Sequence, residues 1–441
     1  MTPHEILRKL ILSGHEAYYV GGYVRDTLLG RKSDDVDLVT SARPKHIIDI
    51  FKKQDVKLVG ESFGVVIVDN TEVATFRLDR YGGLSDKNVE IKYADTLQED
   101  LARRDFTINS LAMNEYGKII DLYNSEHDLR LEIIKFVGDP VERINEDPNR
   151  IIRAIRFATT LGFVIDDDSF MAIKNNSELV KYVAKERIRK EVMKTICSTR
   201  KASRFFLLAS SLDVLEYIFP SLLEGVGVKQ NRYHGANETI FYHNLKVGDA
   251  ISQKYPLVKL AGYLHDVGKV YTKAWNPKTC DWTFYKHDMV GSAVVRQELR
   301  DLRFSKEEIE KVGVLIDSHM MSLPTTKRSH RRRLHQLSDR GVHYKEFLRL
   351  RLADRLGNLM TETTKLSVYK NVLRTFKEII EQKEPFGLRD LAIDGNDVMQ
   401  ILHIGPSKEV GVALKNLLDR VMGDPTLNTK ETLIEILTKE K

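Results

Sequence analysis

A change in hydrophobic periodicity after residue 138 constrains the fold of this chain more than any other feature. Upstream, between Tyr18 and Gly117, short β-rich runs alternate with turn signals, in AYYVGG, VDLVT, FGVVIV, EVATFRL and VEIKYA. Downstream of VGDP the apolar residues recur at helical spacing instead. Runs of the first kind are typical of strands, and spacing of the second kind is typical of amphipathic helices. The sequence therefore predicts an α+β protein in which a mixed sheet with helices forms an N-terminal head and helices form the rest.

The helical part divides further at glycine-rich and turn-rich segments. The expected helices are Arg150 to Leu161, Ser169 to Asn175, Arg187 to Ser198 and the leucine-rich stretch from Arg204 to Tyr217. The segment EGVGVKQNRYHGAN then precedes a histidine-rich helical region, and the turn signals DGND, HIGPS and MGDPTLN follow. A chain of 441 residues is long enough for about three domains. The expected division is a head over 1–138, an all-helical neck over 139–225, a histidine-rich domain over 226–360 and a helical tail over 361–441.

The overall charge is close to balanced. There are 69 Lys and Arg residues against 63 Asp and Glu residues, a net charge of +6, and 42% of the residues are hydrophobic. Any nucleic-acid surface must therefore come from local clustering of basic residues. The clearest cluster is KRSHRRR, Lys327 to Arg333. Such a run also fits a solvated surface or a localisation signal, so it indicates RNA contact only beside other evidence.

Cysteine content and hydropathy indicate the compartment. Cys197 and Cys280 do not have the spacing of a metal site, which fits a reducing environment. No stretch approaches the ~18 apolar residues of a membrane span, and MTPHEILRKLILSG predicts a short amphipathic helix without a signal-peptide cleavage pattern. We expect a cytoplasmic protein without a membrane partner, and both a monomer and a homodimer fit the sequence.

The head contains a candidate phosphate site in GGYVRD. Gly21 and Gly22 follow an apolar strand and precede a helix. Because glycine has no Cβ atom, backbone amides there can approach a ligand closely, and a helix N-terminus favours anions. This segment predicts a triphosphate site, although a glycine pair is also common in tight turns.

A candidate metal site follows in DDVDL, where Val36 separates Asp35 from Asp37. Residues i and i+2 of a strand point to the same face, so the two carboxylates can converge while Val36 and Leu38 enter the core. Two carboxylates suit Mg²⁺, which takes further ligands from water and substrate phosphates. Metal bound there could activate a 3′-hydroxyl and stabilise leaving pyrophosphate. A bare DxD pair would also fit a polar strand end.

The stretch INEDPNRIIRAIRFA places three arginines among apolar residues. Asp147 and Arg150 lie three apart at an expected helix start, which would put both on one face, with Pro148 in the first turn. The carboxylate accepts and the guanidinium donates, so the pair can read the amine and ring nitrogen of cytosine or adenine. Uracil and guanine would leave both groups mismatched, at roughly 1–3 kcal/mol. The pair could thus select C and A without a nucleic-acid template.

The head as a whole resembles that of the class II tRNA nucleotidyltransferase and bacterial poly(A) polymerase family, whose head is polymerase-β-like. The resemblance is carried by GGYVRDTLLGR with the DxD pair, RRDFTINSLAMN from Arg103, EDPNR at Glu146 to Arg150 and KERIRKEV at Lys185 to Val192. The closing IDGNDVMQILHIGPSKEVG is similar to the tail of bacterial CCA-adding enzymes. Several long motifs in the right order make a chance match implausible.

The resemblance implies roles for individual residues. Asp35 and Asp37 are expected to bind Mg²⁺ as the catalytic carboxylates, and Glu72 is an open possibility for a third. The residues expected to contact the nucleotide are Gly22, Arg25, Arg104, Asp147, Arg150, Arg153 and Arg156. For Arg156, a salt bridge to the neck or head is the alternative to nucleotide contact. KERIRKEV is expected to support the neck.

Histidines and aspartates recur through the third region. His265 and Asp266 are adjacent in LAGYLHDVGK, and the other members of the set are His243, His287, His319 and Asp354. In this order they resemble an HD-type phosphohydrolase domain. That resemblance implies one metal position and a second position or phosphate site; the first is held by His243, His265, Asp266 and Asp354, and the second by His287 and His319. Imidazole with carboxylate suits Mn²⁺, Co²⁺ or Ni²⁺ better than Mg²⁺.

The expected activity is template-independent addition of CCA to tRNA 3′ ends from CTP and ATP. The HD domain is expected to act as a phosphatase, 2′-nucleotidase or 2′,3′-cyclic phosphodiesterase, or else to be a scaffold that helps hold tRNA. An A-adding enzyme or poly(A) polymerase would share the head, and C-addition is expected to depend on a loop within Arg77 to Leu97. A protein that is chiefly a phosphohydrolase, or a non-catalytic RNA-binding protein, is a further alternative.

Overall fold

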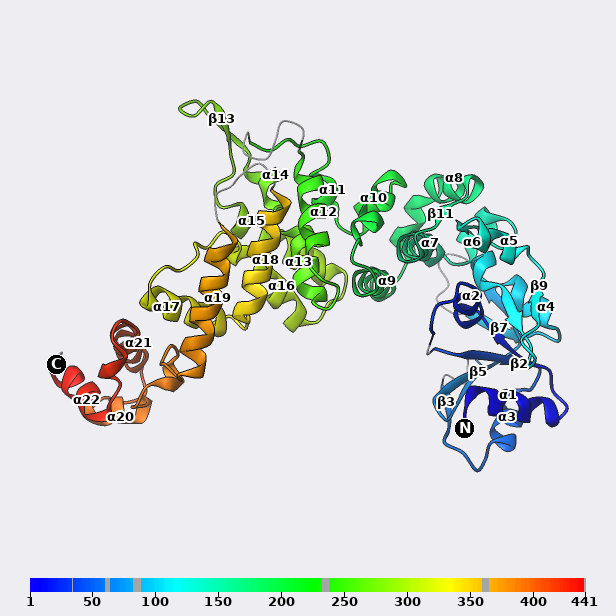
Figure 1. The fold of residues 1–441 in the computed structure, drawn as a ribbon, viewed down its shortest axis with the longest axis horizontal. Coiled ribbons are helices and arrows are strands. Elements are labelled where there is room, and N and C mark those ends of the chain that lie inside the picture. Colours follow the sequence, from blue (N-terminus) through cyan, green and yellow to red (C-terminus); the bar gives the residue numbers. More distant parts are fainter. Residues whose placement is uncertain (34, 60–63, 82–88, 232–237, 359–364, 440–441) are drawn as a thin grey trace. The chain divides into compact units, whose positions relative to one another are not determined.

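The chain forms two compact units, Met1–Ile218 and Phe219–Lys441, in a computed structural model (Figure 1). The structure describes residues 1–441 except 34, 60–63, 82–88, 232–237, 359–364 and 440–441. No helix among the described residues is long and apolar enough to span a membrane.

A seven-stranded sheet forms the centre of the head. Its strands, in their order across the sheet, are β3 (Val56–Val59), β4 (Val65–Val68), β5 (Thr71–Thr75), β2 (Asp37–Thr40), β1 (Ala17–Val20), β8 (Leu111–Met113) and β9 (Ile119–Asp121). The β2–β5 pair is parallel and the other pairs are antiparallel. The prediction of a mixed sheet is therefore confirmed. Strands β3, β8 and β9 were not predicted.

Helices pack on this sheet and complete the head. They are α1 (Pro3–Leu12), α2 (Gly22–Leu28), α3 (Pro44–Ile50), α4 (Leu97–Ala102) and α5 (Ser125–Arg130). Helix α1 begins with a capping box in which Thr2 and Glu5 satisfy each other's backbone amides, and it buries Ile6, Leu7 and Leu10. Val20, Val39 and Phe76 belong to a core that also includes Leu101 of α4. This packing holds the strand ends that carry the candidate site.

The segment Arg77 to Leu97, expected to contain a loop for C-addition, is described only in part. Strands β6 (Arg77–Tyr81) and β7 (Val89–Tyr93) form an antiparallel pair. Residues 82–88 of that segment lie outside the described residues.

Helices also follow the head within the first unit. They are α6 (Pro140–Glu146), α7 (Asn149–Leu161), α8 (Asp167–Asn175), α9 (Lys185–Ser198) and α10 (Ser203–Ser211), with 3₁₀ segments at Ser177–Tyr182 and Leu215–Tyr217. A further 3₁₀ turn, Thr107–Asn109, lies within the head. The three helices α7, α8 and α9 confirm predictions. The prediction of a continuous helix from Arg204 to Tyr217 was wrong, because α10 ends at Ser211 and Asp213 has a positive φ of 56°. A short parallel pair, β10 (Ile133–Ile134) and β11 (Val164–Ile165), lies among these helices.

The second unit is almost entirely helical (Figure 1). Its helices are α11 (Pro220–Leu223), α12 (Ile240–Ala250), α13 (Pro256–Leu264), α14 (Gly268–Thr272), α15 (His287–Asp301), α16 (Lys306–Ser318), α17 (Lys327–Asp339), α18 (Tyr344–Gly357), α19 (Leu366–Glu381), α20 (Gly395–Leu402), α21 (Lys408–Gly423) and α22 (Lys430–Lys439). A small hairpin of β12 (Ala274–Asn276) and β13 (Asp281–Thr283) interrupts them. The last three helices form their own core, which includes Val398, Leu417, Val421 and Leu433.

The basic run KRSHRRR forms the start of α17 and pairs with one acid after α19 and one acid of α21. Lys327 and Arg331 contact Glu384, while Arg328 and Arg332 contact Asp419 of α21. Arg331 is buried and also donates 2.8 Å to the Met422 carbonyl. These cations therefore join α17 to the C-terminal helices, and phosphate contact would compete with ion pairs that already exist.

Candidate nucleotide and metal sites

One cavity in the first unit collects all the residues expected to act in the head. Its volume is about 560 Å³. It is lined by all nine predicted residues, namely Gly22, Arg25, Asp35, Asp37, Arg104, Asp147, Arg150, Arg153 and Arg156. They come from strand β2, helices α2 and α7 and the segments before β2, after α4 and after α6. The fold thus brings together motifs that lie more than 100 residues apart in the sequence.

Positive charge dominates this cavity. Nine cationic side chains line it, namely Arg25, Arg77, Arg103, Arg104, Arg150, Arg153, Arg156, Arg187 and Lys194. Five acidic side chains line it as well, namely Asp35, Asp37, Glu72, Asp105 and Asp147. An excess of positive charge in a concave site favours an anion such as a nucleoside triphosphate. Clustered carboxylates in the same cavity favour a divalent cation.

The carboxylates meet at the beginning of β2. The strand begins at Asp37, so Asp35 precedes it and is exposed. The argument that both carboxylates alternate within one strand was therefore wrong, although both line the cavity. Glu72 of β5 is the cross-strand partner of Asp37 in the parallel pair. That register gives Glu72 a place beside the predicted pair, which the sequence left open.

The electrostatics of Asp37 fit a bound cation. Burial, together with the charges of Asp35 and Glu72, raises the pKa of Asp37 to about 6. Although cations line the cavity, Arg104 alone among the named causes counteracts this rise, and a divalent ion at the carboxylates would supply further positive charge. Among the described residues, sets of at least three potential ligand atoms within 4.8 Å of one another occur only in the second unit. The head carboxylates are thus more loosely arranged, as suits Mg²⁺ that takes its other ligands from water and phosphate.

The turn before α2 places backbone and guanidinium groups at the cavity. Gly21 has a φ of 68°, and a Cβ atom on it would lie 3.1 Å from a guanidinium nitrogen of Arg104. Glycine is favoured there because an L side chain would be strained and crowded. Arg25 is buried, pairs with Asp26 and donates 2.7 Å to the Asn109 side chain. Both predicted arginines are therefore held at the cavity wall.

A buried network fixes Arg153. Arg153 donates to Asp105 from Nε at 2.8 Å, and the Asn109 amide donates to the same carboxylate at 3.1 Å. Burial alone would raise the pKa of Asp105, but Arg153 and the Asn109 hydrogen bond lower it to about 2. Asp105 is therefore ionised at neutral pH and anchors Arg153 between the RRDF segment and α7.

Asp147 and Arg150 face the cavity but have separate partners. Asp147 is not in α7, because it ends α6 with an extended backbone (φ −147°), and α7 begins at Asn149. The prediction that both residues share a helical turn was therefore wrong. The Asp147 carboxylate accepts two hydrogen bonds from Arg187, at 2.9 and 2.6 Å. Arg150 is 4% exposed and donates to Glu146 at 2.7 Å and to the Arg103 carbonyl at 2.9 Å.

Helix α9, which carries KERIRKEV, supports these residues. Arg187 holds Asp147, and the buried Glu191 pairs with Arg156. Arg156 also lies over the Phe157 ring, 3.8 Å from its centroid. The salt bridge considered for Arg156 is therefore present, and the same side chain lines the cavity.

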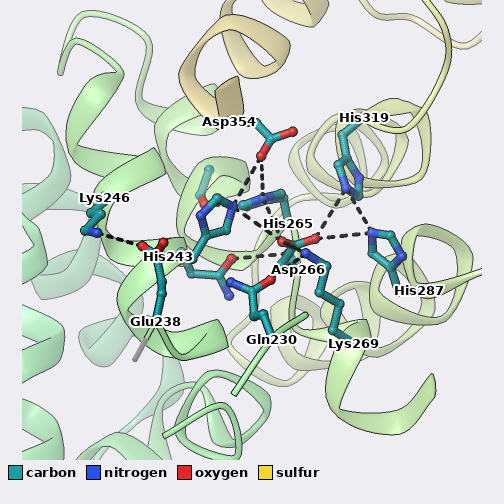
Figure 2. A network of polar contacts seen from close by, with 12 residues as sticks. Gln230, Glu238, His243, Lys246, His265, Asp266, Lys269, His287, His319 and Asp354 are labelled. Carbon is teal, nitrogen blue, oxygen red and sulfur yellow. Dashed lines mark hydrogen bonds and ion pairs between the residues drawn. The ribbon is translucent and has the colours of Figure 1, made fainter. Parts of the chain in front are cut away.

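The second unit gathers the HD residues in one cluster, in which all but the partly exposed Asp354 are buried (Figure 2). Asp266 lies at its centre, with its Oδ1 3.2 Å from His287 Nε2 and 3.4 Å from His319 Nε2. Its Oδ2 lies 3.3 Å from His265 Nε2. On the other side, His243 Nε2 is 3.2 Å from Asp354 Oδ1. All six predicted residues are thus together, although the sequence spreads them over four helices and the turn after α13.

Backbone carbonyls orient the imidazoles toward the centre of this cluster. The Nδ1 atoms of His265, His287 and His319 lie 2.9, 2.7 and 2.6 Å from the carbonyl oxygens three residues before them. An Nδ1–H donor to a carbonyl leaves Nε2 unprotonated and free to bind a metal. Each ring therefore points its ligand nitrogen inward.

The cluster fits a transition metal. Two sets of three ligand atoms lie within 4.8 Å of one another, one of His243, His265 and Asp354 and one of His265, Asp266 and His319. His265 Nε2 is buried and lies between two carboxylates, 3.3 Å from Asp266 Oδ2 and 3.6 Å from Asp354 Oδ1, at distances a shared metal ion could bridge. Without a metal, burial disfavours the charge on His265, but Asp266 raises its pKa to about 10. Mixed nitrogen and oxygen ligands suit Mn²⁺, Co²⁺ or Ni²⁺.

Several residues of both sites were not predicted. In the head they are Asp105, Glu191 and Arg187, which position the predicted residues. In the HD cluster the addition is Lys269, whose Nζ lies 2.5 Å from Asp266. Lys269 follows Asp266 by three residues in HDVGK, which places it on the same helical face. That spacing could have indicated it, whereas no local signal links Glu191 to Arg156.

Comparison with known protein families agrees with this geometry. Family models match three consecutive segments, a poly A polymerase head domain over 17–135, a probable RNA and SrmB-binding site of polymerase A over 162–225 and an HD domain over 241–359. A head and an RNA-binding segment of this kind, followed by an HD domain, define a class of nucleotidyltransferase-like proteins. Over these three segments the chain is similar to poly A polymerase heads and their RNA-binding segment, and the HD match lies in its second unit.

Relatives with established names align over different lengths. A CCA-adding enzyme of Ligilactobacillus salivarius is 44% identical over 194 residues, so this chain spans about half of that relative's length (48%) and 43% of the chain is aligned. A CCA-adding enzyme of Bacillus cytotoxicus is 28% identical over 97% of this chain and 95% of its own length. An A-adding tRNA nucleotidyltransferase of Deinococcus radiodurans is 28% identical over 92% of each chain.

The fold is also similar to a solved structure. The crystal structure of the Bacillus stearothermophilus CCA-adding enzyme in complex with CTP matches with a TM-score of 0.72 and 24% identity, covering 100% of this chain and 98% of that chain. At this identity the likeness shows that the fold is shared.

Proposed function

We propose that this chain is a tRNA nucleotidyltransferase that adds CCA to tRNA 3′ ends from CTP and ATP and releases pyrophosphate. The observation that carries the proposal is the first-unit cavity. Three clustered carboxylates, several arginines and the Asp147 and Arg150 side chains all line this one space. The CCA-adding enzyme of Bacillus cytotoxicus, aligned over nearly the whole chain, supports it.

In this proposal Asp35 and Asp37 hold Mg²⁺, and Glu72 is a third candidate ligand. Divalent metal at these carboxylates would supply the positive charge that activates the tRNA 3′-hydroxyl and stabilises the leaving pyrophosphate. Arg25 and Arg104, with the backbone at Gly22, hold the triphosphate by charge and hydrogen bonds. Their positions at the cavity wall would align the α-phosphate with the attacking hydroxyl.

Asp147 and Arg150 select the base. The carboxylate accepts from the exocyclic amine of cytosine or adenine, and the guanidinium donates to the ring nitrogen beside it. Arg153 and Arg156 neighbour this pair and assist in nucleotide contact. Alanine at Asp147 or at Arg150 should lower discrimination against UTP and GTP by about fivefold or more, since each mismatched group costs roughly 1–3 kcal/mol. Unchanged base selectivity would refute this role.

The tRNA is gripped outside the head. We propose that the segments 139–225, 226–360 and 361–441 act as neck, HD body and tail and bind tRNA by its shape and phosphates, as is usual for RNA helices. The run Lys327 to Arg333 contributes less than its charge suggests, because four of its cations pair with Glu384 and Asp419.

The first test is incorporation of nucleotides. The protein is incubated with tRNA that ends before CCA and with tRNA that ends in CC, supplied with CTP, ATP or both. Addition of both C and A supports the proposal. Addition of A to the CC-ending tRNA, without any addition of C, would contradict the proposal and favour an A-adding enzyme. The A-adding tRNA nucleotidyltransferase of Deinococcus radiodurans, 28% identical, is a relative of that kind. Long runs of A would indicate a poly(A) polymerase.

We further propose that the HD cluster is a metal-dependent phosphohydrolase with phosphatase, 2′-nucleotidase or 2′,3′-cyclic phosphodiesterase activity. The metal is Mn²⁺, Co²⁺ or Ni²⁺, which would polarise a phosphate and activate water. Lys269 is placed to neutralise Asp266 and phosphate charge. The alternative is a scaffold for tRNA. Hydrolysis of a 2′,3′-cyclic nucleotide that is lost in His265→Ala supports catalysis, and no metal-dependent turnover in the unmodified protein would leave only the scaffold.

The two activities belong to separate sites. Asp35→Ala should abolish nucleotide incorporation and spare phosphodiester hydrolysis, while Asp266→Ala should do the reverse. A protein that only hydrolyses phosphate esters would incorporate no nucleotide in any tRNA assay. Loss of both activities from Asp35→Ala would contradict separate sites.

A further inference from the structure

An exposed aromatic hairpin lies between Asp266 and His287 in the sequence, two residues of the HD cluster. Strands β12 and β13 pair Trp275 directly with Trp282, so both indoles lie on one face of the hairpin. Their ring centroids are 5.3 Å apart in an edge-to-face arrangement. Figure 1 shows the hairpin extending from the helices of the second unit near α14. The described helices leave this indole pair open to solvent.

The exposure of these side chains is unusual. Trp275 is 53% exposed and Trp282 is 37% exposed, while the neighbouring Tyr285 is 76% exposed. Tryptophan is highly buried on average, and a concentration of exposed aromatic surface marks a site that binds something. An edge-to-face pair of indoles leaves at least one ring face available for another flat ring.

The charge around the hairpin selects the kind of partner. The segment from Lys269 to Lys286 contains four lysines and one acid, a net charge of +3 (4 − 1). The ammonium of Lys273 lies 4.4 Å from the Trp282 ring centroid. Aromatic rings interleaved with cations are typical of surfaces that stack unpaired bases and neutralise the phosphates between them. Bases within a duplex are already stacked on one another and would gain little there.

Both ends of the hairpin segment are fixed to the HD cluster. Before it, Gly268 packs so closely on α15 that a Cβ atom would lie 2.0 Å from the His287 carbonyl oxygen. After it, the Phe284 carbonyl oxygen lies 2.7 Å from His287 Nδ1. Trp282 precedes His287 by five residues, so the platform lies within roughly 18 Å of that ligand. A short stretch of single-stranded RNA can span this distance, with its bases at the hairpin and its terminal phosphate at the HD cluster.

We propose that the Trp275–Trp282 hairpin is a stacking platform for the unpaired bases of an RNA end whose terminal phosphate is held at the HD cluster. The substrate class of the HD domain is then single-stranded RNA 3′ ends and not free phosphate esters. The inference rests on the proposed phosphohydrolase activity of the HD cluster. It gives that cluster an RNA 3′ end as substrate, the same kind of molecule that the head is proposed to extend.

Intrinsic fluorescence provides a direct test, because Trp275 and Trp282 are the only two tryptophans in the chain. Titration of the full chain with a short single-stranded RNA that ends in CCA and a 2′,3′-cyclic phosphate should quench this fluorescence saturably. A blunt RNA duplex should quench it far less. Equal quenching by both, or none at RNA concentrations that saturate hydrolysis, would overturn the platform.

Kinetics test the consequence for substrate choice. In Trp275→Leu/Trp282→Leu the ratio of kcat/KM for the oligonucleotide to that for bis(p-nitrophenyl) phosphate should fall at least about fivefold, the lower end of one stacked base. Trp275→Phe/Trp282→Phe retains flat rings and should keep the ratio within about twofold. Tyr116→Ala, which removes an 85% exposed aromatic from the first unit, is the matched control and should leave it unchanged.

The outcomes separate this inference from the proposed activity. An unchanged ratio in the leucine variant, with normal turnover, refutes the platform and leaves the phosphohydrolase standing. Absence of turnover on every substrate, with saturable quenching by single-stranded RNA, refutes the phosphohydrolase and supports an RNA-binding hairpin. Equal loss in the leucine and phenylalanine variants would show that hairpin folding, and not stacking, explains the effect.

Discussion

Asp105→Asn should destabilise the first unit and weaken the proposed nucleotide site together. The substitution keeps the shape of the side chain and an oxygen that can accept from the Phe106 amide, 2.8 Å away. It removes the charge that holds Arg153. The amide would also place N–H donors opposite a guanidinium, which has no acceptor.

The magnitude follows from the lowered pKa. A pKa of about 2 for Asp105, against about 3.9 when unperturbed, corresponds to roughly 2.6 kcal/mol at 1.36 kcal/mol per unit. The Arg153 side chain is 31% exposed, so water can solvate its charge after Asp105 is neutralised and offset part of the lost interaction energy. We expect a loss of about 1.5–2.5 kcal/mol at pH 7. For a unit of this size that lowers the Tm by about 4–8 °C.

The pH dependence has a definite sign. Asp105 has a lower pKa in the folded than in the unfolded chain, so its ionised form stabilises the fold above about pH 4. This contribution is lost as the pH falls from about 4 toward 2, where the folded form also takes up a proton. The difference between Asp105→Asn and the unmodified chain should therefore be full at pH 7 and shrink toward pH 2.

Differential scanning calorimetry measures the effect. The tryptophans lie only in the second unit, so a transition without a change in their fluorescence belongs to the first. Asp95→Asn is the control, because Asp95 pairs with Arg43 at 3.1 Å but has a side chain that is 89% exposed. It should cost at most about 1 kcal/mol. An equal Tm shift in both variants, or a difference at pH 7 below 1 °C for Asp105→Asn, would refute the reasoning.

Three further substitutions test other parts of the fold. Lys259→Met removes a fully buried ammonium that donates to two backbone carbonyls at 3.2 and 3.0 Å, so it should destabilise the second unit by about 1–3 kcal/mol, measured by thermal loss of tryptophan fluorescence. Gly268→Ala should displace the His287 backbone, since the added Cβ meets it at 2.0 Å, and should weaken Mn²⁺ binding in calorimetric titration. Arg331→Met should break the buried pair with Glu384 and speed tryptic cleavage of the last helices; an unchanged rate would contradict a joining role for α17.

Much of the head could be predicted because its signals are local. Alternation in runs such as VDLVT follows from strand geometry, and β5 buries Thr71, Val73 and Thr75 on one side as the pattern requires. Strands β8 and β9 are only three residues long, so the alternation of apolar and polar residues is too short to identify them. The register of Glu72 beside Asp37 depends on pairing between strands β2 and β5, which no local pattern encodes.

The six proposed HD ligands could be selected from the sequence because their order in the chain is distinctive, but their arrangement in space could not be predicted. His243 and Asp354 are 111 residues apart, and their contact depends on how α12 packs on α18. The break after α10 was missed for another reason. Asp213 adopts a positive φ without being glycine, and a leucine-rich pattern continues through it.

The sequence indicated what Asp147 and Arg150 can donate and accept, but their exposure determines how they can act. The Arg187 side chain that holds Asp147 is 51% exposed, and such surface pairs contribute about 0–1 kcal/mol. A base amine can therefore replace Arg187 at the carboxylate at little cost. Arg150 is 4% exposed and its hydrogen bonds to Glu146 and the Arg103 carbonyl are sheltered from water, so breaking them would cost more. In the proposed base-reading pair, Asp147 can therefore exchange Arg187 for an incoming base. Arg150 stays fixed by its buried hydrogen bonds, so each incoming base has to fit a guanidinium in one position.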